Sequence, residues 1–202
     1  MNSIKHATTD HPIEPHIAQR WSPYSFSDQA VNDSDLRSLF EAARWAASSY
    51  NAQPWSYLVA QKSDAEGFAR MLSCLVEANQ SWAKSAPVLA LGCTHLNFAH
   101  NGKPNAAALH DLGLASATLT FEASARGLVV HQMIGIEPER VNDLYQLPSD
   151  VRPLTALAIG YVAPAEDLPE SLRSRDQAPR TRKPLAEFVF GHPWGSVAPL
   201  AQ

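Results

Sequence analysis

The sequence predicts a mixed fold, α/β or α+β, in which helices cover a sheet. Segments with helical periodicity alternate along the chain with short apolar runs, which are too short for most helices and are typical of buried strands. The chain also has 202 residues and an apolar content of 45%, which is enough for one sizeable core. We therefore expect a single domain in which helices shield the strands from water.

The first predicted elements are a helix and a strand. Apolar residues recur at spacings of three and four across residues 34–49, which predicts an amphipathic helix capped by Asp33 or Ser34. Residues 55–60 are rich in aromatic and β-branched side chains, a composition typical of a strand. The connection between them holds hydroxyl and amide side chains but no glycine.

The middle of the chain predicts two more helices around a buried strand. Ser63 and Glu66 have the spacing of a capping box and indicate a helix that begins there. The short apolar run at residues 87–94 is typical of a buried strand. Residues 105–126 are rich in Ala and predict a long helix in close contact with another helix. Gly113 within it suggests a close backbone approach.

The last regular elements are a strand, a short helix and a second buried strand. Residues 127–135 have the pattern of a strand followed by a loop. The helix expected over residues 138–147 begins with Pro138, a residue common at the first helical position. Residues 154–162 form another apolar run and predict a buried strand.

Both ends of the chain are predicted to form arms. Residues 1–19 carry three His and two Pro without periodicity, which indicates a mobile or docked N-terminal arm. Residues 163–202 hold six Pro, so regular structure is disfavoured there. Phe188 and Trp194 in this tail need an apolar surface, which favours an extended arm that wraps another surface.

The charge and the cysteines exclude several classes of protein. The net charge of −4 and the pI near 6.0 give no global attraction to nucleic acid or anionic membranes. The chain has no run long enough for a spanning helix, and its N-terminus lacks the apolar core of a signal peptide. Cys74 and Cys93 stand alone, so buried free thiols are expected. We therefore expect a cytoplasmic protein.

The usual catalytic motifs are absent from the sequence. It has no G-x-G-x-x-G after a strand, no P-loop and no G-x-S-x-G elbow. His95 and His100 lie in a polar loop, where solvation is favoured over metal binding. His110 and Asp111 are neighbours on a helix and point in different directions. For His131, at a strand end, a structural role is favoured over a catalytic one.

Two groups of polar side chains remain as binding candidates. Arg20 with Ser22, and Arg180 with Arg182, offer forked donors that suit phosphate, with plain surface solvation as the alternative. Asn51, like Gln53, carries an amide that both donates and accepts, as needed to bind the edge of a heterocycle.

The spacing of these residues resembles the flavin-binding opening of the nitroreductase family. The family pattern is R-x-S-x-x-x-F, then E-A-A, then S-x-x-N-x-Q-P-W. The matching residues here are Arg20, Ser22, Phe26, Glu41 to Ala43, Ser48, Asn51, Gln53, Pro54 and Trp55. Later stretches are similar too, so the resemblance covers about residues 20 to 195.

This resemblance implies an FMN-dependent reductase with an α+β sandwich fold. The implied architecture has a mostly antiparallel central sheet flanked by helices, with residues 20–162 as the FMN-binding domain. It also implies an intertwined homodimer, with FMN at the interface and residues 163–202 wrapped around the partner subunit. NADH or NADPH supplies a hydride, and the acceptor is a nitroaromatic, a quinone or an enone-like metabolite.

The resemblance also assigns roles to individual residues. Arg20 and Ser22 hold the phosphate and ribityl end, while Arg180 and Arg182 clamp the phosphate. Asn51 binds the pyrimidine edge of the flavin ring. The remaining cofactor-binding residues are Trp21, through its backbone, Tyr24, Gln53, and the loop beside the ring, which comprises Gln132, Met133, Ile134 and Gly135. No side chain acts as a nucleophile, because the flavin carries the chemistry.

Two positions depart from the family pattern. Tyr24 stands where many relatives carry a basic residue, and Ile134 stands where many carry a Glu. The first change affects the redox potential and the second affects the contacts with nicotinamide. Two alternatives stay open: FMN-dependent dehydrogenation, dehalogenation or flavin breakdown, and a flavin-storing or regulatory protein that turns over slowly.

Overall fold

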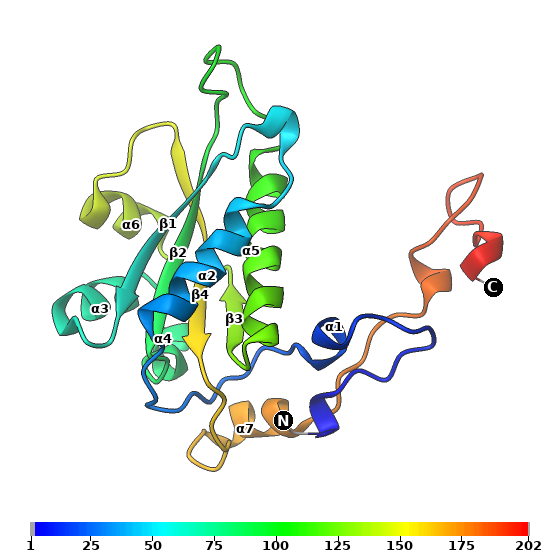
Figure 1. The fold of residues 1–202 in the computed structure, drawn as a ribbon, viewed down its shortest axis with the longest axis horizontal. Coiled ribbons are helices and arrows are strands. Elements are labelled where there is room, and N and C mark those ends of the chain that lie inside the picture. Colours follow the sequence, from blue (N-terminus) through cyan, green and yellow to red (C-terminus); the bar gives the residue numbers. More distant parts are fainter. Residues whose placement is uncertain (1–2, 202) are drawn as a thin grey trace.

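The computed structural model describes residues 3–201 and contains one four-stranded sheet with helices on both faces (Figure 1). The strands are β1 (Trp55–Gln61), β2 (Val88–His95), β3 (Val129–Met133) and β4 (Val151–Gly160). Their spatial order is β1-β2-β4-β3, and every neighbouring pair is antiparallel. The α+β class with a mostly antiparallel sheet is therefore confirmed.

Helices α2 (Asp33–Arg44) and α5 (Ala108–Ala125) cover one face of the sheet (Figure 1). Their buried side chains pack against alternate residues of the central strands, among them Val88 and Ala90 of β2. The small residues of α5 allow this contact with α2, as predicted. Gly113, however, points away from the body, and a Cβ there would meet no atom within 4 Å. The predicted close approach at Gly113 therefore does not occur within the described chain.

The opposite face is covered by α3 (Ala65–Leu72), α4 (Glu77–Ala83) and α6 (Pro138–Tyr145) (Figure 1). Leu89 and Leu91 of β2 point to this side, so successive residues of the strand alternate between two apolar layers. Burial on both faces explains why the central strands are continuously apolar rather than alternating with polar residues.

Two helix starts differ from the sequence prediction. The cap of α2 is Asn32, whose side-chain oxygen accepts a 2.7 Å hydrogen bond from the Asp35 N–H, so the prediction of Asp33 or Ser34 is wrong. The predicted capping box at Ser63 does not form. Instead, Asp64 caps α3, because its carboxylate accepts a hydrogen bond from the Gly67 N–H. A turn in which the Asp64 N–H donates to the Gln61 carbonyl places that carboxylate at the first turn of the helix.

Several short elements were not predicted from the sequence. They include α4, in which only Trp82 and Ala83 are buried, so its apolar periodicity is weak. The others are α1 (Pro15–Gln19), α7 (Glu170–Gln177), and four 3₁₀ segments: η1 (Ser3–Lys5), η2 (Ser49–Asn51), η3 (Leu185–Glu187) and η4 (Pro199–Ala201). Among residues 3–201, no helix is both long enough and apolar enough to cross a membrane.

The two predicted arms lie beyond one end of the sheet (Figure 1). The N-terminal segment runs beside α7 and the start of the C-terminal arm, and the end of that arm reaches away from the body (Figure 1). Phe188 and Trp194 are exposed in this chain, at 57% and 89%. Residues 1, 2 and 202 of the predicted arms lie outside the described residues, and the domain boundaries stay a prediction.

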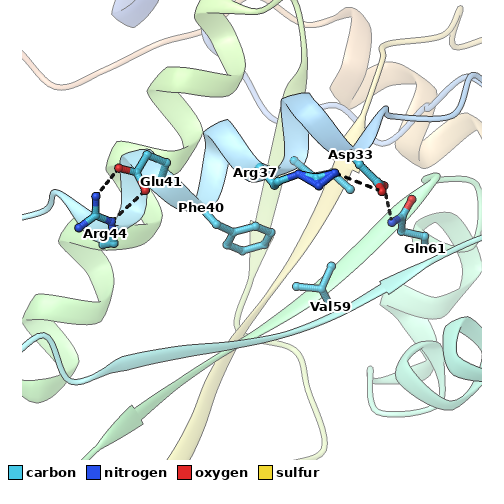
Figure 2. A pocket seen from close by; sticks show the side chains of 8 residues that line it. Asp33, Arg37, Phe40, Glu41, Arg44, Val59 and Gln61 are labelled. Atoms are coloured by element: carbon cyan, nitrogen blue, oxygen red, sulfur yellow. Dashed lines mark hydrogen bonds and ion pairs between the residues drawn. The ribbon is translucent and has the colours of Figure 1, made fainter.

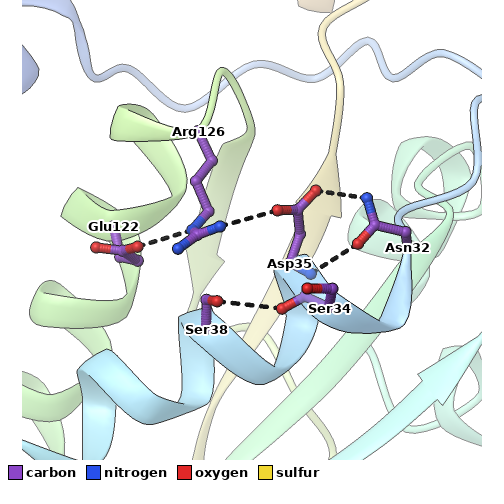
Figure 3. A network of polar contacts seen from close by, with 6 residues as sticks. All are labelled: Asn32, Ser34, Asp35, Ser38, Glu122 and Arg126. Atoms are coloured by element: carbon purple, nitrogen blue, oxygen red, sulfur yellow. Dashed lines mark hydrogen bonds and ion pairs between the residues drawn. The ribbon is translucent and has the colours of Figure 1, made fainter.

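A polar cluster joins α2 to α5 at the end of the sheet nearest the arms (Figure 3). Arg126 donates to Glu122 at 2.7 Å and to Asp35 at 3.0 Å, and Asn32 donates to the second oxygen of Asp35. Because these side chains are partly exposed, the ion pairs contribute little stability. Their geometry nonetheless fixes the first turn of α2 against the last turn of α5.

We expect Gly92→Ala to lower the free energy of unfolding by about 1 to 3 kcal/mol, because it overpacks a closed site. A Cβ at Gly92 would lie 2.9 Å from the Thr155 methyl carbon and 3.4 Å from Leu112. Gly191→Ala is the control, since the nearest atom there is 3.9 Å away. Urea unfolding followed by circular dichroism measures both, and equal stability of the two variants would contradict the packing account.

Candidate functional site

Arginines from opposite ends of the sequence meet at the arm end of the fold. Arg20 follows α1, whereas Arg180 and Arg182 follow α7. Burial lowers the pKa of Arg20 from its ordinary value, and the charges of Arg180 and Arg182 lower it further. Arg20 also donates to the Ser22 hydroxyl at 3.1 Å. The structure therefore brings together the four side chains that the sequence assigned to a phosphate.

The guanidinium of Arg180 is held by the N-terminal segment. Its Nη1 donates to the Ala18 carbonyl at 2.7 Å and to the Lys5 carbonyl at 3.1 Å. Burial lowers the pKa of Arg180, and the nearby Arg182 adds to this effect. Guanidinium groups that repel one another in this way are stabilised by a bound anion, and their forked donors fit a phosphate.

A buried carboxylate ties α7 to the segment that follows Ser22. Asp176 is 4% exposed and accepts from the backbone N–H of Tyr24 at 3.0 Å and of Ser25 at 3.3 Å. Burial raises the pKa of Asp176, which these N–H groups and the Lys5 ammonium oppose. The contact fixes the two arginine-bearing segments relative to each other.

The amide loop, residues 48–53, has a strained backbone. Tyr50, Asn51 and Gln53 have φ angles of 53°, 53° and 47°, in the left-handed region that favours glycine. Two contacts hold the loop: the Ser48 hydroxyl accepts from the Gln53 N–H at 3.0 Å, and a carboxylate oxygen of Asp111 accepts from the Ser49 N–H at 3.1 Å. Backbone strain of this kind is typical of functional sites.

The amide loop and the arginines lie at opposite ends of α5 (Figure 1). Ser49 bonds to Asp111 in the first turn of that helix, whereas Ser124 in the last turn donates to the His16 carbonyl at 3.1 Å. A helical rise of 1.5 Å per residue separates Asp111 from Ser124 by about 20 Å. One chain therefore does not bring Asn51 next to Arg20.

The predicted loop beside the ring, Gln132 to Gly135, is only partly a loop, because Gln132 and Met133 are the last two residues of β3 and only Ile134 and Gly135 follow the strand. Gln132 donates to the Thr120 hydroxyl at 2.8 Å and to the Ser116 carbonyl at 3.1 Å, while Met133 points into the core. Ile134 is 68% exposed. Gly135 packs so closely on the Asn79 amide that a Cβ there would collide with it, and Asn79 donates to the Gly135 carbonyl at 3.0 Å.

Tyr24 and Trp21 face the interior rather than an open cavity. The Tyr24 ring packs edge-on against Trp82 at 5.1 Å between centroids and against His131 at 4.8 Å, and its hydroxyl accepts from Arg175 at 3.4 Å. Trp21 is 7% exposed. Among the site candidates, these two side chains are therefore placed to support the site.

His131 has the structural contacts that the sequence favoured. Its Nδ1 lies 2.8 Å from the Pro23 carbonyl oxygen, which requires Nδ1 to carry the proton and donate. Burial lowers the pKa of His131 below its ordinary value, and the Arg20 charge lowers it further. The ring is thus neutral near pH 7.

Surface cavities also lie away from the arginines. A groove of about 660 Å³ between α2 and β1 has an apolar floor of Leu36, Phe40 and Val59 and a charged rim (Figure 2). None of the predicted site residues lines it. A pocket of about 500 Å³ beside Gln53 contains His95, whose Nδ1 lies 3.0 Å from an Asp150 oxygen. Within residues 3–201, no three His, Cys, Asp or Glu gather as metal ligands.

Sequence reasoning missed the residues that assemble the arginines. Lys5 and Asp176 are both buried, but each lies in a polar segment whose pattern indicates only a solvated arm. The single local signal is the charge of Asp176 in a segment otherwise rich in Arg. Cys74 and Cys93 are buried free thiols, as expected.

Comparison with known proteins relates this arrangement to a family. Residues 17–161 match the model of the nitroreductase family. A crystal structure described as an oxidoreductase containing FMN has a TM-score of 0.90 and 31% identity, and the match covers 97% of this chain and 100% of that one.

Two curated relatives extend this similarity. An uncharacterised 15.4 kDa protein of Mycolicibacterium smegmatis is 34% identical, with 62% of this chain and 83% of that protein covered. A Bacillus subtilis protein named FMN reductase [NAD(P)H] is 28% identical, with 81% and 67% covered.

We expect the free energy of unfolding of the ligand-free protein to fall as the pH drops through about 6.5, because the unfolded chain then binds a proton that half-buried His131 resists. The stability that neutral His131 contributes is fully present above pH 6.5. It is lost progressively as the pH falls from 6.5 to the lowered pKa of the folded protein. In His131→Asn, which can still donate to the Pro23 carbonyl, the loss between about pH 7.5 and about pH 5.5 should be smaller. Urea unfolding measures it, with exposed His110→Asn as the control, and equal slopes in the two variants would refute the assignment.

Proposed function

The chain belongs to the nitroreductase family, and we propose that it is an FMN-dependent oxidoreductase that takes a hydride from NADH or NADPH and passes electrons to a second substrate. Relatives named FMN reductase [NAD(P)H] and major NAD(P)H-flavin oxidoreductase, the latter from Aliivibrio fischeri, support this activity. When bound, FMN supplies the hydride chemistry, and the protein supplies binding, orientation and electrostatics.

The observation that carries the proposal is the convergence of three guanidinium groups with the Ser22 hydroxyl. FMN differs from riboflavin by a phosphate monoester, which is a dianion near pH 7 and accepts forked hydrogen bonds. Burial lowers the pKa of Arg20 and of Arg180, repulsion from the neighbouring guanidinium groups lowers both further, and a bound dianion relieves that repulsion. The residues present therefore fit the phosphate of FMN.

At the other end of the site, the amide loop is proposed to orient the ring. The Asn51 side chain donates to the pyrimidine edge, and the strained backbone presents it without the freedom of a glycine turn. A donor at that edge stabilises the reduced ring more than the oxidised one, which is the condition for lowering a barrier. Gln132, Ile134 and Gly135 lie beside the ring.

We further propose that a homodimer completes the site, with Asn51 and Gln53 of the second copy meeting the arginines of the first. The separation of about 20 Å along α5 supports this arrangement. So does the C-terminal arm, whose Phe188 and Trp194 are exposed in the single chain and need an apolar partner surface. An obligate interface of this kind buries about 2,000 Å² or more.

The acceptor is proposed to be a nitroaromatic, a quinone or a similar molecule. No described side chain is assigned a nucleophilic role. Tyr24 lacks the charge that many relatives place near the ring, and Ile134 replaces a polar contact, so both change the electrostatics of reduction. The cytoplasmic location expected from the sequence stays a prediction.

We expect the protein to purify with FMN, and Arg20→Ala to weaken FMN binding by about tenfold or more, because a charged hydrogen bond to phosphate is lost. Riboflavin binding should change little, and turnover at saturating FMN should largely return. Titration of the ligand-free protein by flavin fluorescence measures both affinities. Exposed Arg37→Ala is the control, and colourless wild-type protein that takes up no FMN would falsify the cofactor assignment.

Replacing Asn51 with Ala should instead slow flavin reduction at saturating FMN. The activation free energy should rise by about 1 to 3 kcal/mol, which is the cost of leaving a buried polar group without its partner. Stopped-flow bleaching of flavin absorbance by NADH or NADPH measures this rate. A wild-type rate in Asn51→Ala would make Asn51 a positioning residue only. Wild-type protein that bleaches with neither nucleotide would favour the flavin-storing protein.

The same two variants test whether the site is shared between subunits. In a mixed dimer of Arg20→Ala and Asn51→Ala, one of the two shared sites has both wild-type residues. Random mixing at limiting FMN should then restore about one quarter of the wild-type activity, since half of the dimers are mixed. If mixing restores nothing although mixed dimers form, each site lies within one chain.

A further inference from the structure

Lys5 occupies a position that is unusual for a lysine. It lies in the N-terminal segment, outside the residues that match the family model, and yet only 5% of its surface is exposed. Its ammonium donates to the carbonyl of Arg175 at 2.8 Å and to that of Ala178 at 2.6 Å. These carbonyls end α7, where unpaired acceptors and the negative end of the helix favour a cation.

The same ammonium contacts the other half of the arginine cluster. It lies 4.9 Å from the centroid of the Trp21 ring, a cation–π distance. Trp21 stands between Arg20 and Ser22 in the sequence, so a fixed indole sets the direction of both neighbours. An ammonium has three donors; two are used by the α7 carbonyls, and the aromatic face covers a further side. Lys5 is therefore not placed to bind a ligand itself.

The backbone of Lys5 completes the bridge. Its carbonyl accepts from Arg180 at 3.1 Å, beside the Ala18 carbonyl, which also accepts from the Ala7 N–H at 2.9 Å. One residue thus contacts the α7 terminus, the Arg180 guanidinium and the Trp21 ring. Burial lowers the pKa of Lys5, the Asp176 carboxylate opposes that effect, and Arg180 adds to it. The nearby carboxylate helps to keep the ammonium charged.

We propose that Lys5 is a positioning residue for phosphate recognition: it holds the Arg20–Ser22 segment and the Arg180–Arg182 segment in one arrangement without touching the phosphate. This inference rests on the proposed function, because it takes FMN as the ligand. It assigns a role to the N-terminal segment, which lies almost wholly outside the family match.

Lys5 should affect recognition of the phosphate but not recognition of the flavin ring. Without the Lys5 ammonium, the end of α7 loses two hydrogen bonds, and the backbone that leads from α7 to Arg180 and Arg182 is no longer held there. Among the described residues, the Lys5 side chain contacts the end of α7 and the Trp21 ring rather than the amide loop or β3, so binding of the flavin ring should be unaffected. Removing the Lys5 ammonium should therefore lower the affinity for FMN but not the affinity for riboflavin, which lacks the phosphate.

The experiment compares FMN with riboflavin on full-length protein. Lys5→Met removes the charge and the donors at similar length. It should weaken FMN binding by about tenfold, the effect of losing one charged contact, and leave riboflavin affinity within about twofold. Lys84→Met, at the exposed C-terminal end of α4, should change neither affinity. Lys5→Arg, which keeps a cation and donors, should recover part of the FMN affinity.

The possible results separate this inference from the proposed function. An unchanged ratio of riboflavin to FMN dissociation constants in Lys5→Met overturns the positioning role, whether both affinities hold or both fall equally. If Lys5→Met does not fold by circular dichroism, Lys5→Gln, which retains a neutral donor, is titrated in its place and must show the same fall in the ratio. Wild-type protein that prefers riboflavin to FMN overturns the proposed phosphate site itself.

Discussion

Burial of the central strands on both faces is the constraint on which the rest of this structure depends. Along β2, Val88 and Ala90 enter one apolar layer while Leu89 and Leu91 enter the other. Such a strand is stable only if helices cover both sides, so α2 and α5 must pack on one face and shorter helices on the other. The edge strands β1 and β3 carry two of the polar segments that the sequence assigned to the site. The amide loop leads into β1, and Gln132 lies at the end of β3.

The same constraint decides what the sequence could predict. The apolar runs at 87–94 and 154–162 identify strands because no charged residue interrupts them, and the structure places β2 and β4 there. Helix starts were less accurate because Asn32, Asp33 and Ser34 are all good caps, and tertiary packing rather than residue type decides among them. Elements such as α4 and α7 bury few side chains and leave almost no periodic signal.

Part of the site was predictable from the chemistry of single side chains. The forked donors of Arg20 and Arg180 suit an anion, and the fold brings Arg180 to the Ala18 carbonyl, two residues before Arg20. Backbone strain was not predictable, because the absence of glycine argues locally against a left-handed turn. Ser48 and Asp111 impose that turn on the amide loop through tertiary contacts. Lys5 was not predictable either, since a lysine in a polar segment has no local feature that marks it as buried.

The contact between Lys5 and α7 also bears on how the protein is made. It joins residues that are 170 positions apart, so it closes a loop that contains most of the described chain. Closing so long a loop is slow, because the loss of chain entropy is offset only by contacts that form after the sheet has folded. During synthesis the N-terminal segment can dock on α5, where Ser124 donates to the His16 carbonyl, but the Lys5 ammonium lacks its carbonyl partners until α7 follows. The sheet and its helices can therefore fold before α7 is synthesised, whereas the arginine cluster can assemble only after α7 and the residues that follow it.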